Sequence, residues 1–227
     1  MPAPEQVLYA MPAMRALSRA EAAAVTSRIP KRAGSYGLRM GMHEGIGECP
    51  DVVAHWVRLC RRDACWTGDL RARCNEPLPF ANDSFALVWL SQILQFQNGA
   101  EDLLREVFRV TAPGGLLLVS GMHPLSAWTP WLAWNLRDSG DCLHLHAPAH
   151  LVRTMDRLGF EVESKHRYGS SLPRVAGNPR SFRLLGGGFL LTARKKQDAV
   201  TPLHAVRLRR VAPAHGSLAP GAHRECA

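Results

Sequence analysis

Two uninterrupted apolar runs, separated by a helical pattern, constrain the fold of this chain more than any other feature. Residues 85–90 read Phe-Ala-Leu-Val-Trp-Leu and residues 116–119 read Leu-Leu-Leu-Val. A strand that is apolar throughout is covered on both faces, which is typical of a parallel sheet. Between the runs, apolar residues recur at helical spacing over 103–110, and Pro113-Gly-Gly115 ends that pattern. This order of strand, helix and strand predicts an α/β fold with a mostly parallel sheet.

The same alternation extends to both sides of this unit. We expect parallel neighbouring strands near residues 36–41, 64–68, 85–90 and 115–121. Two later segments, residues 160–168 and 188–194, are expected to pair antiparallel at one edge of the sheet. Pro50 and Asp51 suit the first turn of a helix. The residues that this helix would present on one face are Val53, Trp56, Val57 and Cys60.

The chain divides into three regions by composition and pattern. Residues 1–35 are interpreted as an N-terminal helical appendage, in which Ser18-Arg-Ala-Glu21 fits a capping box that opens a helix. Residues 36–194 form the α/β domain. Residues 195–227 are rich in Pro, Ala, Arg and Gly without periodicity, which predicts a disordered basic tail.

Charge and hydropathy limit the classes of partner. The formal net charge of the 227 residues is +9, and residues 194–227 account for +5 of it. A strongly basic chain raises nucleic acid as a partner. Here the tail, with Arg207-Leu-Arg-Arg210, is the only hint, because interleaved aromatic and Gly-rich RNA-binding signatures are absent from the sequence. We therefore expect a small-molecule partner rather than nucleic acid.

No apolar run approaches the roughly 18 residues that a membrane-spanning helix needs. The first residues also lack the basic and apolar regions of a signal peptide, so we expect a cytoplasmic protein with no membrane partner. The six cysteines are irregularly spaced and are expected to be reduced thiols. A run of possible metal ligands consists of Cys142, His144, His146 and His150. The alternative is a histidine-rich surface loop, and we expect no metal because no second ligand pair is visible.

Residues 67–121 contain a series of motifs whose order and spacing are more specific than any one of them. The series reads Thr67-Gly-Asp-Leu, Leu78-Pro-Phe-Ala-Asn-Asp-Ser-Phe85, Leu103-Leu-Arg-Glu-Val-Phe-Arg-Val110 and Pro113-Gly-Gly-Leu-Leu-Leu-Val119. It resembles the type-11 methyltransferase domain of the class I S-adenosylmethionine-dependent methyltransferases, tightly over 67–121 and loosely over 36–194. The resemblance implies a Rossmann-like fold, S-adenosyl-L-methionine as cofactor, and methyl transfer to an unidentified small-molecule acceptor.

The chain departs from this family mainly at cofactor positions. The glycine-rich turn after the first strand reads Gly41-Met-His-Glu-Gly45-Ile-Gly47, with bulky residues between the glycines. Cys74 stands where the family usually has an aspartate, and Ala86 replaces another acid. The segment before Leu78-Pro-Phe80 is also short for the full fold. The alternative is therefore a non-catalytic binding or scaffold protein with an eroded cofactor site, because a fold does not guarantee a function.

In an open parallel sheet, ligands lie beyond the carboxyl ends of the strands. The resemblance implies that Asp69 accepts hydrogen bonds from the cofactor ribose. The full set of expected cofactor contacts is Gly41, Gly45, Gly47, Asp69, Leu78, Leu90, Ser91 and Gln92.

The acceptor side of the site is expected after the strand that ends near residue 121. His123 is a candidate general base, since an unperturbed histidine titrates near neutrality. The alternative is a histidine that only shapes the loop. Trp128, Trp131 and Trp134 are spaced three apart, so Trp128 and Trp131 are candidate acceptor contacts in an aromatic lid. They are equally compatible with packing in the core.

Overall fold

The computed structural model describes residues 4–31, 33–42, 49–62, 64–97, 99–137, 143–173 and 186–197. The chain consists of two units, Met1–Gln197 and Asp198–Ala227. The second unit, which contains most of the predicted tail, lies outside the described residues. The boundaries predicted for the three regions therefore stay predictions, apart from the corrections below.

The described part of the first unit is built on one sheet of eight strands in the order β4-β3-β2-β1-β5-β6-β8-β7. The strands are β1 (Gly34–Gly41), β2 (Val53–Arg62), β3 (Cys65–Gly68), β4 (Ala72–Arg73), β5 (Phe85–Ser91), β6 (Thr111–Met122), β7 (Phe160–Tyr168) and β8 (Gly188–Lys195). β1, β5 and β6 are parallel neighbours, whereas β8 pairs antiparallel with both β6 and β7. The predicted α/β class, the central parallel strands and the antiparallel edge are confirmed.

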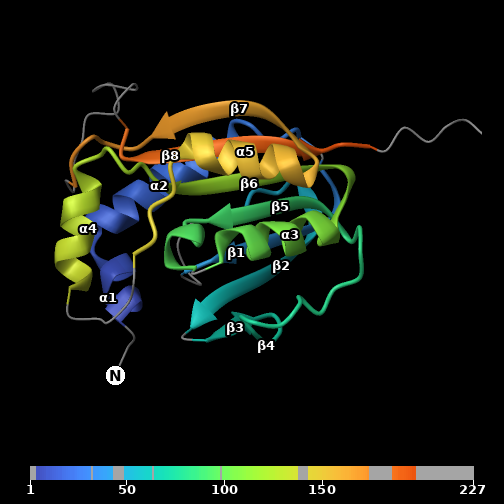
Figure 1. Ribbon diagram of the computed structural model, residues 1–227, viewed down its shortest axis with the longest axis horizontal. Coiled ribbons are helices and arrows are strands. Elements are labelled where there is room, and N and C mark those ends of the chain that lie inside the picture. Colours follow the sequence, from blue (N-terminus) through green and yellow to red (C-terminus); the bar gives the residue numbers. More distant parts are fainter. Residues whose placement is uncertain are drawn as a thin grey trace, which may run out of the picture. The chain divides into compact units, whose positions relative to one another are not determined.

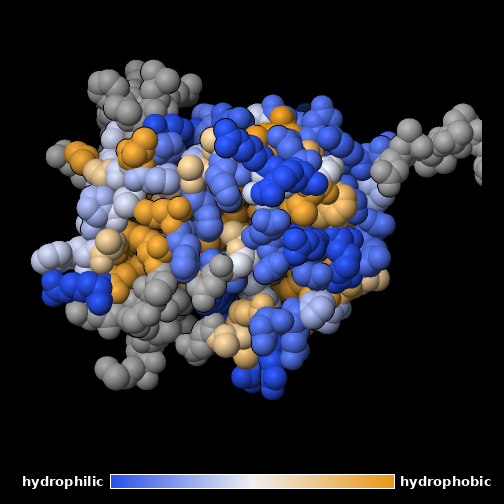
Figure 2. Space-filling view, in the orientation of Figure 1, coloured by the Kyte–Doolittle hydropathy of each residue, from blue (hydrophilic) through white to orange (hydrophobic). Residues whose placement is uncertain are grey.

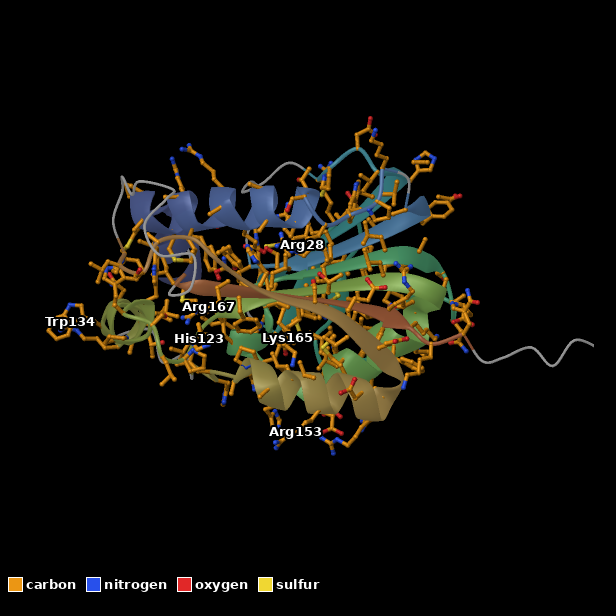
Figure 3. The ribbon with its side chains drawn as sticks, turned by 90° about the horizontal axis from the view of Figure 1, so that it is seen from above. Arg28, His123, Trp134, Arg153, Lys165 and Arg167 are labelled. Atoms are coloured by element: carbon orange, nitrogen blue, oxygen red, sulfur yellow. The ribbon has the colours of Figure 1, made fainter. Side chains whose placement is uncertain are left out.

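Helices cover both faces of this sheet and its carboxyl end. They are α1 (Pro4–Ala10), α2 (Pro12–Thr26), α3 (Ala100–Val110), α4 (Trp128–Leu136) and α5 (Pro148–Leu158), with a short 3-10 helix η1 (Leu94–Phe96). Figure 1 shows α3 and α5 in front of the sheet, with α1 and α4 beyond the carboxyl ends of the strands. Figure 3 shows α2 on the opposite face. Polar side chains gather over the outer sides of α3 and α5 (Figure 2), as expected for amphipathic helices.

The helix expected around residues 53–60 is instead a strand. β2 pairs in parallel with β1, from Gly34 opposite Val53 to Gly41 opposite Cys60. Apolar residues at helical spacing do not distinguish a helix from a half-buried strand when the segment is short. The backbone of β1 provides the hydrogen-bonding partners that make this segment a strand. Its β-branched residues Val52, Val53 and Val57 also favour a strand. No described residue between β1 and β2 is helical.

The strand expected at 64–68 exists, but the prediction that it would be parallel is wrong. β3 pairs antiparallel with β2, with Leu59 opposite Gly68 and Arg62 opposite Cys65. The physical reason is the short connection between Arg62 and Cys65, because a parallel neighbour needs a crossover of about a dozen residues or more. The returning strand β4 then pairs antiparallel with β3.

Two predicted boundaries also move. α2 begins at Pro12, so Ser18 and Glu21 are interior helical residues rather than a capping box. Both are buried, because they belong to the stripe of α2 that faces the sheet. At the other end, β8 includes Lys195, which the prediction assigned to the tail. The Lys195 ammonium donates to the backbone oxygens of Phe108 and Thr111, and this anchors it to the domain.

Candidate functional site

A groove of about 890 Å³ lies between the ends of β2 and β4 and the start of α3. Trp66, Leu78 and Leu103 contribute apolar walls, and Gln97 contributes an amide. The Gln97 Nε2 atom is buried and has no hydrogen-bond partner in the part of the chain that the structure describes. Leaving a buried donor unsatisfied costs about 1–3 kcal/mol. A ligand that offers an acceptor atom at this place would remove that cost.

The groove wall around Leu78 is held by α3. Arg109 donates to the backbone oxygens of Leu78 and Phe80, both at 2.8–2.9 Å, and to the Glu106 carboxylate. Glu106 in turn accepts a hydrogen bond of 3.0 Å from the Leu78 backbone N–H. The hydrogen bond from Arg109 lowers the pKa of Glu106, although burial opposes this shift. The helix motif and the Leu78-Pro-Phe80 motif of the sequence are thus one structural unit.

A smaller pocket of about 200 Å³ brings together Gly41 at the end of β1 and Asp69 after β3. Gly41 lies close to β5, since a Cβ atom there would be 3.3 Å from the Ser91 carbonyl oxygen. The Asp69 carboxylate accepts a hydrogen bond of 2.8 Å from the Arg58 backbone N–H. Asp69 lines this pocket but not the larger groove, whereas Leu78 lines only the groove. The predicted contacts Gly45 and Gly47 lie outside the described residues.

The predicted contacts at the end of β5 are largely engaged inside the protein. Leu90 is fully buried in the core. Ser91 Oγ and Gln92 Nε2 each donate a hydrogen bond of 2.8 Å to the Glu21 carboxylate of α2, and Ser120 of β6 donates to it as well. We call these four residues, Glu21, Ser91, Gln92 and Ser120, the Glu21 cluster. Their side chains hold α2 against the carboxyl ends of β5 and β6.

Gln92 is also conformationally unusual. Its φ is +51°, in the left-handed region that few residues other than glycine adopt. Such strain persists only where the surroundings hold it in place, and it often marks functional sites. The Gln92 carbonyl oxygen Oε1 accepts from Tyr9 of α1, and its amide also donates to Tyr168 of β7. Burial, together with the Glu21 charge, raises the pKa of Tyr168 well above its ordinary value.

Sequence reasoning missed Glu21, Gln97 and Arg39. Glu21 had a usable signal, because it falls at helical spacing with Met14, Leu17 and Val25 on the buried side of α2. Arg39 is also buried, and its guanidinium lies 4.8 Å from the centroid of the Trp89 ring while lining the pocket beside Gly41. A charged residue within an apolar strand is the corresponding signal for Arg39.

His123 follows β6 directly and is partly buried. Its Nδ1 atom accepts a hydrogen bond of 3.2 Å from the Leu125 backbone N–H. In the neutral ring the proton then resides on Nε2, which becomes a donor. Burial lowers the pKa of His123, and the charge of Arg167 lowers it further. To accept a proton at Nε2, the neutral ring would have to carry its own proton on Nδ1. Nδ1 could then no longer accept the hydrogen bond from the Leu125 backbone N–H.

The three tryptophans of α4 have three different surroundings. Trp128 is fully buried and donates from Nε1 to the Ser170 carbonyl oxygen at 2.9 Å. Trp131 is partly buried and packs edge-on against Trp128, with 5.5 Å between ring centroids. Trp134 is 68% exposed, with Arg137 stacked on its ring. This gradient supports the packing alternative for Trp128 and leaves Trp131 as the acceptor candidate with a partly accessible ring.

Among the described residues, no group of three or more His, Cys, Asp or Glu side chains could hold a metal ion. Cys142 lies outside those residues. The described helices include none long and apolar enough to cross a membrane.

Comparison with known proteins finds similarity to methyltransferases over part of the chain. Residues 49–119 match the model of a family described as "Methyltransferase domain". The malonyl-[acyl-carrier protein] O-methyltransferase of Halorhodospira halophila is 31% identical over 110 residues, which cover 48% of this chain and 37% of that protein. The enzyme of the same name from Erwinia billingiae is 41% identical over 61 residues, which cover 24% of each chain. The chain thus spans well under half the length of these relatives.

The fold is also found among solved structures. A methyltransferase of Thermotoga maritima, described as a possible histamine N-methyltransferase, has a TM-score of 0.55 with 17% identity, covering 81% of this chain and 92% of that one. Residues 49–119 thus resemble a methyltransferase domain, and the fold is the Rossmann-like fold of the class I S-adenosylmethionine-dependent methyltransferases.

Proposed function

We propose that this protein binds S-adenosyl-L-methionine and transfers its methyl group to a small-molecule acceptor. The observation that carries the proposal is the groove between β4 and α3, with its apolar walls and the unsatisfied amide of Gln97. It is walled by Leu78 of the family motif and lies beyond the carboxyl ends of the strands, where ligands of such sheets bind. The family match over residues 49–119 supports the same ligand.

The residues present fit the adenine ring and the ribose of this cofactor. The groove would hold the adenine ring between Trp66, Leu78 and Leu103, with Gln97 Nε2 donating to a ring nitrogen. Asp69 would accept from the ribose hydroxyls, and the close approach of Gly41 to β5 would let the chain pass near the ligand. When bound, the cofactor supplies a methyl group that is already activated by the sulfonium.

The protein's own contribution to methyl transfer is then positioning. Holding donor and acceptor in line at near-attack distance lowers the barrier because the entropy of alignment is lost on binding. His123 and Trp131 remain the candidates on the acceptor side, and Trp128 is retained as a residue that fixes the lid. The Glu21 cluster would keep the ends of β5 and β6 rigid beside the reacting groups.

The second candidate is a non-catalytic binding or scaffold protein. The observation that favours it is the engagement of Ser91 and Gln92 by Glu21, together with Cys74 at a groove position where an acid is expected. In that case the fold would persist without affinity for the cofactor.

Titration calorimetry with S-adenosylmethionine and S-adenosylhomocysteine separates the two candidates. Binding would stabilise the protein by about 2.7 kcal/mol at a hundredfold excess over Kd. A protein that gives no heat and no thermal shift with millimolar cofactor is the scaffold protein.

Two variants test the proposed contacts. Gln97→Leu removes an unsatisfied buried amide, so we expect equal or higher stability of the free protein but about tenfold weaker binding of the cofactor. Asp69→Ala should weaken binding similarly, and Asp69→Asn, which keeps an acceptor oxygen, should restore part of the affinity. Equal affinity of Gln97→Leu and the wild type would remove the groove from the cofactor site.

A further inference from the structure

A pocket of about 630 Å³ lies beside β3, near the edge of the sheet where β3 and β4 are seen in Figure 1. Its lining includes Arg62, Cys65, Thr67, Leu70 and Arg71, and we call it the β3 pocket. No described residue that lines it is acidic, whereas carboxylates line both the groove and the pocket beside Gly41. Of these three sites, the β3 pocket therefore has the largest excess of positive charge.

The pairing of β2 with β3 brings the polar side chains of this pocket to one face of the hairpin. Arg62 lies opposite Cys65 in the antiparallel ladder, and Cys60 lies opposite Thr67. Residues that are directly opposed in a ladder project from the same face of the sheet. Trp66 alternates with Cys65 and Thr67, and it lines the groove but not the β3 pocket. The β3 pocket thus extends over the face of the hairpin that Trp66 does not occupy.

The two arginines are the donors that the β3 pocket offers to a ligand, because the Thr67 hydroxyl donates to the Cys60 carbonyl oxygen at 3.1 Å. Arg62 and Arg71 are both exposed, and Arg71 makes no hydrogen bond or ion pair with another described residue. Arg62 has an interaction elsewhere in the chain. A guanidinium has several N–H donors in a planar fork, so Arg62 can keep that interaction and also donate to a ligand.

Charge and size indicate which ligand suits the pocket. A phosphate group carries a charge of about −1.5 to −2 at pH 7, which matches two guanidinium groups, and it accepts bidentate hydrogen bonds from arginine. The pocket is larger than a phosphate group alone, and Ala64 and Leu70 add apolar lining beside the arginines. A ligand that fills it has a phosphate group joined to a small organic part.

We propose that the β3 pocket binds a small phosphate ester, with the phosphate held by Arg62 and Arg71 and the organic part against Leu70. The inference goes beyond the proposed function, because neither Gln97 nor Asp69 of the proposed cofactor contacts lines this pocket. Ala64 and Cys65 line both the β3 pocket and the groove, so the phosphate ester is a second ligand that binds next to the cofactor.

Cys65 is a reporter at this pocket. Cys65 and Cys74 are both partly buried and both line the groove, but only Cys65 lines the β3 pocket. Each thiolate displaces iodide from iodoacetate, which is an anion, and from iodoacetamide, which is neutral. Mass spectrometry of the full-length protein gives both alkylation rates at each cysteine. We expect the ratio of the iodoacetate rate to the iodoacetamide rate to be about fivefold higher at Cys65 than at Cys74, because the arginines attract the anion. A ratio at Cys65 no higher than that at Cys74 would overturn the proposal.

Protection of Cys65 then identifies the ligand. Saturating phenyl phosphate should slow the alkylation of Cys65 by iodoacetamide about tenfold, and inorganic phosphate should need about tenfold higher concentration because it lacks the organic part. Phenol, which lacks the anion, should not protect. Protection by phenol equal to that by phenyl phosphate would show an apolar site and contradict the proposal. Equal protection by inorganic phosphate would show a site for the free ion and contradict the ester.

Variants make the test specific to the pocket. Arg71→Gln should weaken phenyl phosphate about tenfold, since it removes one charge-assisted contact. It should also bring the alkylation ratio of Cys65 close to that of Cys74. Arg153→Gln is the matched control, because Arg153 is an exposed cation on α5 and does not line the β3 pocket (Figure 3). Equal weakening by both variants would reduce the effect to net charge and contradict the proposal.

The outcome is independent of cofactor binding. Arg71→Gln should bind S-adenosylmethionine as the wild type does, because Arg71 lines neither the groove nor the pocket beside Gly41. A wild-type protein that binds phenyl phosphate but not the cofactor would retain the β3 pocket and lose the proposed function. A wild-type protein that binds the cofactor but not phenyl phosphate would lose only the β3 pocket.

Discussion

The two halves of the sheet differ in how completely they are buried. In β5, β6 and β8 nearly every residue is buried, and α3 and α5 cover the face shown in Figure 1. In β2, β3 and β4 most residues are exposed or half-exposed, and no described residue between β1 and β2 is helical. Strands β5, β6 and β8, the buried half, thus have the composition of a core. Strands β2, β3 and β4, the exposed half, have that of a surface.

The polar groups of the two halves also differ, although Trp89 Nε1 and Thr192 Oγ1 in the buried half have no hydrogen-bond partner among the described residues. In the buried half, the Glu21 cluster satisfies its members within the protein. In the exposed half, the groove includes the unsatisfied amide of Gln97. The comparison teaches that one half is packed to maintain the fold, while the other half has an open groove. A chain can therefore keep a methyltransferase fold while the residues around this groove vary.

The largest expected effect is in the buried half. Glu21→Ala removes the acceptor of three buried donors, so we expect a loss of about 3 kcal/mol or more in the free energy of unfolding. Urea denaturation measures it. Glu101→Ala is the control, because the Glu101 carboxylate is 49% exposed and pairs with Arg105 on the surface, where a change of under about 0.5 kcal/mol is expected. Similar losses for both variants would mean that the cluster does not hold the sheet end.

The same substitution in each half tests the comparison directly. Val119→Ala in β6 leaves a cavity at a fully buried residue and should cost about 2–3 kcal/mol, from lost burial of two methyl groups and the cavity itself. Val57→Ala in β2 affects a partly buried residue and should cost less than about 1 kcal/mol. The measurement is again urea denaturation. Equal costs would show that the β2 side is packed as tightly as the β6 side.

A smaller effect concerns pH. Burial lowers the pKa of His146, and burial with the Arg167 charge lowers that of His123, so the folded protein resists protonation of both rings. The unfolded chain then binds more protons near pH 6.5, and the folding free energy contributed by the neutral rings is lost as the pH falls from about 6.5 through the lower folded pKa values.

Denaturation curves at pH 7.5, 6.5 and 5.5 measure this loss. His146→Gln should reduce the dependence, since the His146 Nε2 atom is buried without a hydrogen-bond partner in the described part of the chain. His55→Gln is the surface control and should leave the dependence unchanged, because His55 is exposed on β2 and is not among the groups that shift the pKa of His146. A slope that is the same in all three proteins would rule out His146 as its origin.

The smallest effect is expected from the C-terminal unit. Deleting residues 198–227 should shift Tm by no more than about 1 °C, because a segment rich in Pro, Ala and Arg without periodicity buries little apolar area. Differential scanning calorimetry of both chain lengths measures the shift. A decrease of several degrees would show that this unit contributes to the stability of the first, and would correct the predicted tail.

The sequence by itself determined the α/β class, the central parallel strands and the methyltransferase resemblance. The apolar runs at 85–90 and 116–119 are predictive because a strand covered on both faces tolerates few polar residues. The motif around Leu78 and the helix around Arg109 are predictive together because they bond to one another. Gly41 and Asp69 line one small pocket, and their role as cofactor contacts stays a prediction.

Only the tertiary structure decided the rest. Residues 53–62 form a strand because β1 offers a hydrogen-bonding edge, which a local pattern does not report. Glu21 meets Ser91 and Ser120 across 70 and 99 residues of sequence, and Gln97 reaches the groove through the packing of η1 and α3. The physical reason is that periodicity records which side of an element is buried, whereas the partner of a buried polar group is fixed only when distant elements pack together.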